Sequence, residues 1–191
     1  MLEQLRSIVQ KVNAAKDLQS ALDIIVHRVR DALDTQVCSV YLLDSDINSH
    51  VLMASEGLNK EAVGHVSLEL GEGLIGLVAK HAEPINLQDA SLHPSYHYLQ
   101  ETGEENFHAF LGVPIIHHRS ILGVLVVQHE ERRRFDESEE AFLITLSAQL
   151  AGVIAHAEAT GAIEGLSPSG HKTSDTVFHG ISGSSGVAIG H

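Results

Sequence analysis

The first part of the chain places apolar residues with the period of an α-helix. They recur every three or four positions in two runs, which are Leu2, Leu5, Val9 and Val12, and then Leu18, Leu22, Ile25, Val29 and Leu33. A helix brings residues at this spacing to one face, so each run predicts an amphipathic helix. Asp17 stands just before the second run, where an N-cap side chain is expected. The narrow seam of the first run is typical of a helix that pairs with another helix.

The middle of the chain changes to the patterns of β-strands. β-Branched and apolar residues predict strands at 37–43, 51–54, 66–70, 110–116 and 121–128. The segments Asp44–Asp46 and His117–Ser120 have turn composition, so the strands on either side of each are expected to pair as antiparallel hairpins. Pro114 has no N–H to donate, which places it at an edge or a bulge.

A helical run and a long polar stretch separate the third and fourth of these strands. Residues 74–81 predict a helix, which Glu83 and Pro84 end. Residues 86–106 are polar and irregular, and long irregular segments in compact domains are usually lids or binding loops. We therefore expect this stretch to cover a ligand pocket.

The last helix begins with a capping signal and continues for several turns. Asp136 and Glu139 stand at the two positions of a capping box, with Asp as the cap residue. Leu143, Leu146, Leu150 and Val153 follow at helical spacing, with further apolar residues around them. A helix with more than one apolar face packs on a sheet with one and needs a partner helix for the other. We expect these four residues to form a seam for dimer contact and signalling.

The order of these elements predicts an α+β fold. A central antiparallel sheet is expected, with helices packed on one face and a loop and helix lid over a ligand pocket. Residues 1–16 are expected to form an N-terminal helix for dimer contact, and residues 17–160 the main domain. Residues 161–176 have the small, polar composition of a linker. Residues 177–191 restart an apolar strand pattern, which indicates the beginning of a further domain.

Charge and composition exclude several partners. The 191 residues carry 12 basic and 25 acidic side chains, a formal net charge of −13. Such a chain repels phosphate backbones and anionic lipids, so neither nucleic acid nor a membrane is an expected partner. The one basic run, Arg132–Arg134, is flanked by acidic residues. No apolar run approaches the ~20 residues that span a bilayer, and no signal-peptide pattern is present, so a cytoplasmic location is expected.

The residue pattern indicates neither a nucleophile nor a metal site. Cys38 is the single cysteine and lies in an apolar strand, so a buried, inert thiol is expected. His93 and His97 have four-residue spacing, but a proline interrupts them, and His117 and His118 fall in a turn. We expect no metal at either pair.

A glycine pattern, Gly71-x-Gly73-x-x-Gly76, matches a dinucleotide-binding fingerprint and follows a strand. That fingerprint works only inside a parallel βαβ unit. Here a proline and the long polar stretch follow instead. A turn and the start of a helix are therefore the favoured interpretation.

Several segments, taken in order, resemble the GAF domain. They are Gly71–Ala79 at the start of its central helix, Glu83–Ala90 in the turn that follows, Leu111–Ile115 and Leu122–Leu125 in two closing strands, and Phe135 before the terminal helix. The resemblance covers residues 17–158. It implies the GAF fold and a role in sensing a small molecule.

A narrower resemblance is to enzyme I of the nitrogen-related phosphotransferase system. It is carried by residues 101–105, 110–115, 180–181 and 185–190. The resemblance implies that the full-length protein moves phosphate from phosphoenolpyruvate to a histidine beyond residue 191, with Mg²⁺, and then to a phosphocarrier protein. The GAF domain would tune that transfer through glutamine or 2-oxoglutarate. It implies no catalytic residue, metal or cofactor in the present stretch.

The polar stretch holds the best candidates for contact with an amino acid or a 2-oxo acid. The expected ligand-binding residues are Asn86, Asp89, His93 and Tyr96, facing Tyr41 and Phe110 on the strands. Asp89 or Glu101 would accept from an ammonium group, and Asn86, Tyr96 or backbone N–H groups would donate to a carboxylate. The structural alternative is that Asn86 and Asp89 only cap turns, and for Asp89 both interpretations stay open.

Two functions are compatible with this pattern. In the first, a bound metabolite shifts the packing of the last helix, which carries the signal onward in a homodimer. In the second, side chains fill the pocket and the domain is a scaffold for dimerisation or protein docking.

Overall fold

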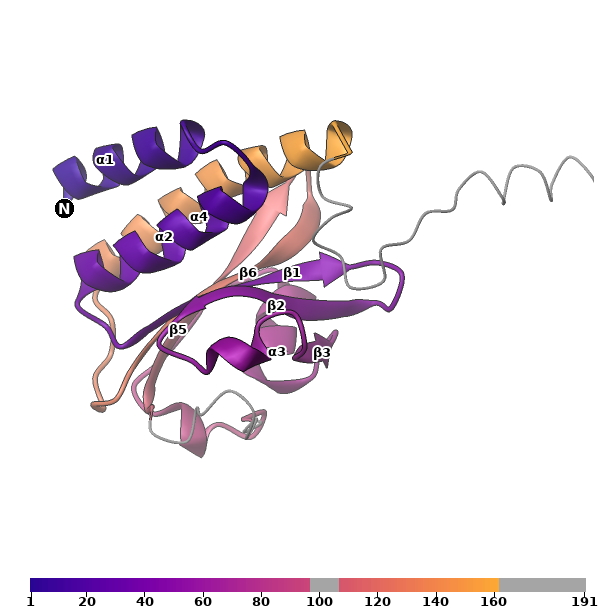
Figure 1. Ribbon diagram of the computed structural model, residues 1–191. Coiled ribbons are helices and arrows are strands. Elements are labelled where there is room, and N and C mark those ends of the chain that lie inside the picture. Colours follow the sequence, from indigo (N-terminus) through magenta and orange to yellow (C-terminus); the bar gives the residue numbers. More distant parts are fainter. Residues whose placement is uncertain (97–106, 162–191) are drawn as a thin grey trace, which may run out of the picture.

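Residues 1–96 and 107–161, which the computed structural model describes, form a six-stranded antiparallel sheet with helices on both of its faces (Figure 1). The strands lie in the order β3-β2-β1-β6-β5-β4. Because β1 pairs with β6, the first and last strands of the described part of the chain meet in the middle of the sheet. The predicted linker, after Gly161, and the predicted strand at 177–191 lie outside the described residues.

Five of the six strands lie where the sequence pattern predicts them. The strands are β1 (Val37–Asp44), β2 (Ser49–Glu56), β3 (Ser67–Glu69), β4 (Ile85–Leu87), β5 (Ala109–His117) and β6 (Ser120–His129). The pattern does not predict β4, because three residues are too few to show a period of two. β4 pairs with residues 110–112 of β5 and forms one edge of the sheet.

The β5–β6 turn has the geometry of a tight hairpin. His118 and Arg119 have φ values of 48° and 70°. Two successive positive φ values are what a type I′ turn requires, and its twist matches that of the flanking strands. This confirms the predicted turn at residues 117–120.

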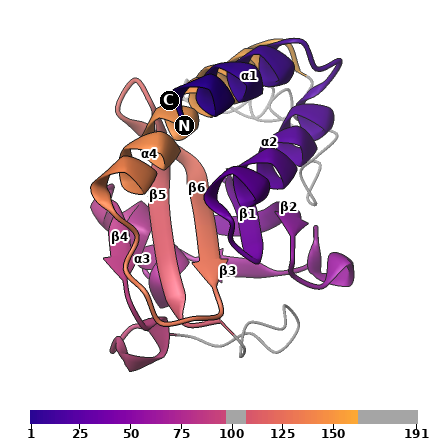
Figure 2. The same ribbon diagram turned by 90° about the vertical axis from the view of Figure 1, so that its left-hand side faces the viewer.

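Three helices cover one face of the sheet, here called the helical face (Figures 1 and 2). They are α1 (Leu2–Asn13), α2 (Leu18–Leu33) and α4 (Glu137–Ala159). Asp17 caps α2 as predicted, by accepting a hydrogen bond from the Ser20 amide at 2.8 Å. The capping box of α4 is also present: Asp136 and Glu139 each accept from the other's backbone N–H, at 2.8 and 2.9 Å.

The opposite face, here called the α3 face, is covered by α3 (Gly73–His81) and two 3₁₀ turns, η1 (Lys60–Ala62) and η2 (Ala90–Leu92). Figure 1 shows α3 across the sheet from α1, α2 and α4. This confirms the predicted α+β fold, an antiparallel sheet with helices packed on one face. The sheet therefore separates two apolar cores.

Helix α4 is buried along the side that was expected to form a seam between two copies. Leu143, Leu146 and Leu150 are 0–1% exposed and belong to the core of the helical face, while Val153 is half-buried against it. A leucine that already packs on the sheet is not available to a second chain. The sequence pattern identified the apolar face of α4, but this face packs against the sheet of its own domain and not against a second copy.

Among the described residues, α4 is also the one helix that is long and apolar enough to cross a membrane. Its apolar residues at helical spacing pack on the sheet. Packing inside the domain thus accounts for its composition.

Candidate functional site

Three of the six predicted ligand-binding residues lie together on the α3 face. Tyr41 on β1 is 1% exposed and Phe110 on β5 is 3% exposed, and both belong to the core beneath α3. Tyr96 is half-buried and packs against the same core. The structure therefore brings the aromatic candidates together, in an environment where a ligand would be shielded from water.

Glycines shape the approach of α3 to this face. Gly71 and Gly73 have φ values of 86° and 66°, which side chains rarely adopt. A Cβ at Gly76 would lie 2.6 Å from the Glu69 carbonyl oxygen, so only glycine fits there. The pattern forms a turn and a helix start, as the sequence analysis favoured, between two strands at opposite edges of an antiparallel sheet. It is not part of a parallel βαβ unit.

Asp89 precedes η2, and both of its carboxylate oxygens have partners. Oδ1 accepts from the Ser91 N–H at 3.1 Å and from the Ser91 hydroxyl at 2.7 Å, and lies 3.2 Å from His108 Nδ1. Oδ2 accepts from Arg132 Nε at 2.7 Å. The side chain is 8% exposed. The Ser91 and Arg132 hydrogen bonds hold the Asp89 pKa far below its ordinary value, so the carboxylate is ionised.

Asn86, the middle residue of β4, points its amide at the segment that leads into α4. Nδ2 donates to the Phe135 carbonyl oxygen at 2.8 Å and to Glu140 Oε1 at 3.0 Å. Oδ1 accepts from the Phe135 N–H at 3.2 Å. These contacts use both donors and one acceptor position of the side chain. A ligand carboxylate would have to displace them.

His93 ends η2 and takes part in a local turn, because its Nδ1 accepts from the Ser95 N–H at 3.0 Å. His117 and His118 stack with ring centroids 4.0 Å apart in the β5–β6 turn. Across residues 1–96 and 107–161, no group of three or more His, Cys, Asp or Glu side chains is placed to hold a metal ion. His97 and Glu101 lie outside the described residues.

His50 on β2 is a buried polar residue that the sequence pattern did not single out. Its ring is 1% exposed, and neither nitrogen has a hydrogen-bond partner among the described residues. It stands opposite Leu43 and Leu68, and since residues opposite each other share a face, it lies on the α3 face with Leu68. Burial lowers its pKa to about 4, so the ring is neutral at pH 7. In the sequence it stands between Ser49 and Val51, near the start of β2, so its burial had no local signal.

Cys38 is fully buried in the core of the helical face. Burial raises the pKa of its thiol far above the ordinary value. A thiol held in the protonated form is not a nucleophile at neutral pH. The expectation of an inert structural cysteine is confirmed.

The basic run Arg132–Arg134 is engaged within the domain. Arg132 bonds Asp89, and Arg134 Nη1 donates to the Asn86 carbonyl oxygen at 3.0 Å. Arg133 forms two hydrogen bonds of 3.1 Å with Glu139 and lies 4.3 Å from the centroid of the Phe135 ring. These contacts explain a basic cluster in an acidic chain without a polyanionic partner.

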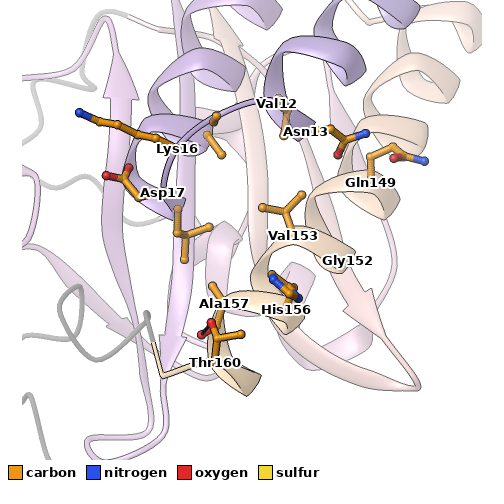
Figure 3. A pocket seen from close by; sticks show the side chains of 13 residues that line it. Val12, Asn13, Lys16, Asp17, Gln149, Gly152, Val153, His156, Ala157 and Thr160 are labelled. Atoms are coloured by element: carbon orange, nitrogen blue, oxygen red, sulfur yellow. Dashed lines mark hydrogen bonds between the residues drawn. The ribbon is translucent and has the colours of Figure 1, made fainter.

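A groove of about 570 Å³ lies away from these residues, between the α1–α2 junction and the second half of α4 (Figure 3). Val12, Val153 and Ala157 give it an apolar part, and Gln149 and His156 add polar groups. None of the six predicted ligand-binding residues lines it. The sequence pattern does not predict this groove, because residues 12–21 and 149–160, which line it, are far apart in the chain.

Comparison with known proteins places this fold in a family. The model of the GAF domain family matches residues 17–154. The chain therefore belongs to the GAF family.

Two relatives indicate the kind of protein in which such a GAF domain occurs. A protein of Escherichia coli (strain K12) called "Phosphoenolpyruvate-dependent phosphotransferase system" is 52% identical over 160 residues, which are 84% of this chain and 21% of that protein. The solved GAF domain of a phosphoenolpyruvate-protein phosphotransferase from Coxiella burnetii is 51% identical, covers 84% of this chain and 96% of its own, and superposes with a TM-score of 0.82. The chain thus spans about a fifth of the length of its curated relative. It is a GAF domain and not itself the phosphotransferase.

A more distant structure shares the fold alone. Free methionine-R-sulfoxide reductase from Neisseria meningitidis has a TM-score of 0.71 at 19% identity and covers 82% of this chain and 89% of its own. That structure holds the reductase in complex with its substrate.

Proposed function

We propose that this chain is the regulatory, small-molecule-sensing domain of a phosphoenolpyruvate–protein phosphotransferase. The observation that carries the proposal is the 52% identity over 84% of the chain to a phosphotransferase system protein. The whole protein would move phosphate from phosphoenolpyruvate to a histidine outside this stretch, with Mg²⁺, and onward to a phosphocarrier protein in the cytoplasm. The GAF domain would set the rate of that transfer.

The proposed ligand is an amino acid or a 2-oxo acid, glutamine or 2-oxoglutarate, held on the α3 face. Tyr41, Tyr96 and Phe110 supply an apolar, aromatic environment there, and His93 lies at the end of η2. Asp89 remains a candidate acceptor for a ligand ammonium, which would replace the guanidinium of Arg132 on Oδ2. Asn86 would contact a ligand carboxylate only by giving up its bonds to Phe135 and Glu140.

The proposed homodimer would use the exposed side of α4, since its leucines face the domain's own core. Ile144 is 41% exposed, and Ala148 and Gly152 lie along the same exposed side. No charged residue occurs between Glu140 and Glu158. In a chain of net charge −13, such a surface lets two copies approach with the least repulsion.

Thermal unfolding of the 191-residue chain with L-glutamine or 2-oxoglutarate tests the sensing role. A ligand at one hundred times its Kd adds ~2.7 kcal/mol to the free energy of unfolding, which is several degrees in Tm. We expect one of the two to raise Tm, and D-glutamine to serve as a control that does not. Tyr41→Phe, which removes only a hydroxyl, tests the α3 face as the binding site by weakening the shift.

The alternative function is a ligand-free scaffold for dimerisation or docking. The deep burial of Tyr41 and Phe110 favours it, because these side chains occupy the space a ligand would need. No Tm shift with any amino acid or 2-oxo acid at millimolar concentration would support the scaffold. Sedimentation of Ile144→Glu against Leu92→Glu, where Leu92 is 80% exposed on η2, tests the proposed α4 contact in either case.

A further inference from the structure

Two segments far apart in the sequence are fastened together beside the α3 face. One is residues 85–92, comprising β4 and η2, here called the strap. The other is residues 132–140, here called the α4 start. Asn86 and Phe135 are 49 positions apart, yet each backbone hydrogen-bonding group of Phe135 bonds the Asn86 side chain, at 2.8 and 3.2 Å.

Further polar contacts join the same two segments. Glu140 in the first turn of α4 accepts from Asn86 Nδ2 at 3.0 Å. Arg134 donates to the Asn86 carbonyl oxygen at 3.0 Å, and Arg132 donates to Asp89 at 2.7 Å. Asn86 is the residue that engages the α4 start through both its side chain and its backbone.

The α4 start is held rigid by hydrogen bonds within it and by packing against the core. Asp136 and Glu139 form the capping box, Arg133 bonds Glu139, and the Phe135 ring is buried in the core of the helical face. A braced segment of this kind moves as a unit rather than bending at one residue. A displacement of the strap would therefore be carried to the first turn of α4.

The strap also touches the α3 face. Ala90 lies in its core, and Ile85 and Leu87 pack against that core. The strap is thus in contact with the proposed ligand environment on one side and with the α4 start on the other. Close-packed interiors transmit such displacements because they cannot absorb them.

We propose that Asn86 is a positioning residue, which fixes the α4 start to the strap and passes a change on the α3 face to α4. This role is distinct from the ligand contact considered for Asn86 above. The transmission of a ligand-induced change rests on the proposed sensing function. The contacts by which Asn86 fixes the α4 start do not depend on it.

The first arm of the test needs no ligand. In the 191-residue chain, Asn86→Asp preserves size but turns a carboxylate oxygen toward the Phe135 carbonyl and Glu140. We expect amide hydrogen exchange at residues 141–146 to rise roughly tenfold, as for the loss of one hydrogen bond to a charged group, with β1 and β6 unchanged. Asn13→Asp makes the same change at the exposed end of α1 and is the matched control.

Rescue separates positioning from general damage. Adding Glu140→Gln to Asn86→Asp reverses donor and acceptor across the pair, so exchange at 141–146 should return toward the wild-type values. Arg134→Gln removes only the contact to the Asn86 carbonyl, and we expect a smaller rise at the same residues. Because Arg134 is exposed at its hydrogen bond, this variant keeps the test decisive if Asn86→Asp fails to fold.

The second arm adds L-glutamine or 2-oxoglutarate. We expect Asn86→Asp to keep the wild-type Tm shift and to lose the ligand-induced change in exchange at 141–146. Exchange that matches Asn13→Asp in the first arm would overturn the proposal, and so would loss of the Tm shift alone, which would make Asn86 a ligand contact. If wild type gives no Tm shift, the sensing function fails while the first arm still decides the positioning role.

Discussion

The two faces of the sheet are built in different ways. The helical face is filled mainly by aliphatic side chains from three helices and the strands, together with Phe135 and Phe142, in one continuous core. The α3 face is smaller and holds Tyr41, Phe110 and the ring of His50, which has no hydrogen-bond partner within residues 1–96 and 107–161. Its helix lies close to the end of β3 at Gly76. Stability on the first face comes from the amount of apolar surface buried. The second face also buries apolar side chains, but it adds polar groups, the Tyr41 hydroxyl and the His50 ring, and such groups are where ligand recognition is expected.

The largest effect is expected on the helical face. Leu146→Ala should lower the free energy of unfolding by about 2–5 kcal/mol, because it leaves a cavity in a close-packed core. Ile144→Ala, two residues earlier on the exposed side of α4, should change it by less than about 1 kcal/mol. Urea unfolding measures both. Equal losses in the two variants would show that the helical face is not the main source of stability.

Lowering the pH should destabilise the folded protein through His50 on the α3 face. The pKa of His50 is about 4 in the folded protein against its ordinary value of 6.5, so between these pH values the unfolded chain binds more protons than the folded one. Above pH 6.5 the His50 ring is neutral in both states, so it does not change the free energy of unfolding. That free energy decreases as the pH falls from 6.5 to 4. At ~1.4 kcal/mol per pKa unit the loss reaches about 3 kcal/mol.

Unfolding measured from pH 7 to pH 4 tests this expectation with two variants. His50→Leu should flatten the loss and cost little stability at pH 7, since no described residue hydrogen-bonds the buried ring that it removes. His81→Gln, at an exposed position, should leave the wild-type profile. A His50→Leu profile as steep as wild type would mean that His50 is not the acid-sensitive group.

Two glycines, one in the helix of each face, should respond to alanine in opposite directions. Gly76→Ala places a Cβ 2.6 Å from the Glu69 carbonyl oxygen and should destabilise the fold by about 1–3 kcal/mol. Gly152→Ala meets nothing within 4 Å and should stabilise α4 by about 0.5–1 kcal/mol. Thermal unfolding of both variants is the measurement. A tolerated Gly76→Ala would show that α3 can lift away from the sheet more easily than its packing suggests.

The sequence pointed to many residues of the candidate site, but it did not show which groups each of them contacts. Tyr96 was expected near a ligand as part of the polar stretch, and Tyr41 and Phe110 as strand residues facing it, and the three do share one face. Asn86 and Asp89 were expected there too, yet their partners come from residues 132–140, from His108 and, for Asp89, from Ser91 in the turn that it caps. The sequence offers no signal for such pairs, since a side-chain amide or carboxylate fits a ligand and a backbone equally well.

The sequence by itself determined the helices, five of the strands and the two caps, because spacing and capping are local properties of ten to twenty neighbouring residues. Only the tertiary structure decided that three residues of a polar stretch become β4, that the leucines of α4 face their own sheet, and that His50 is sealed from water. Each of these depends on which distant segments pack together. The contacts and the pKa of a residue are set by these distant segments, which its local sequence does not contain.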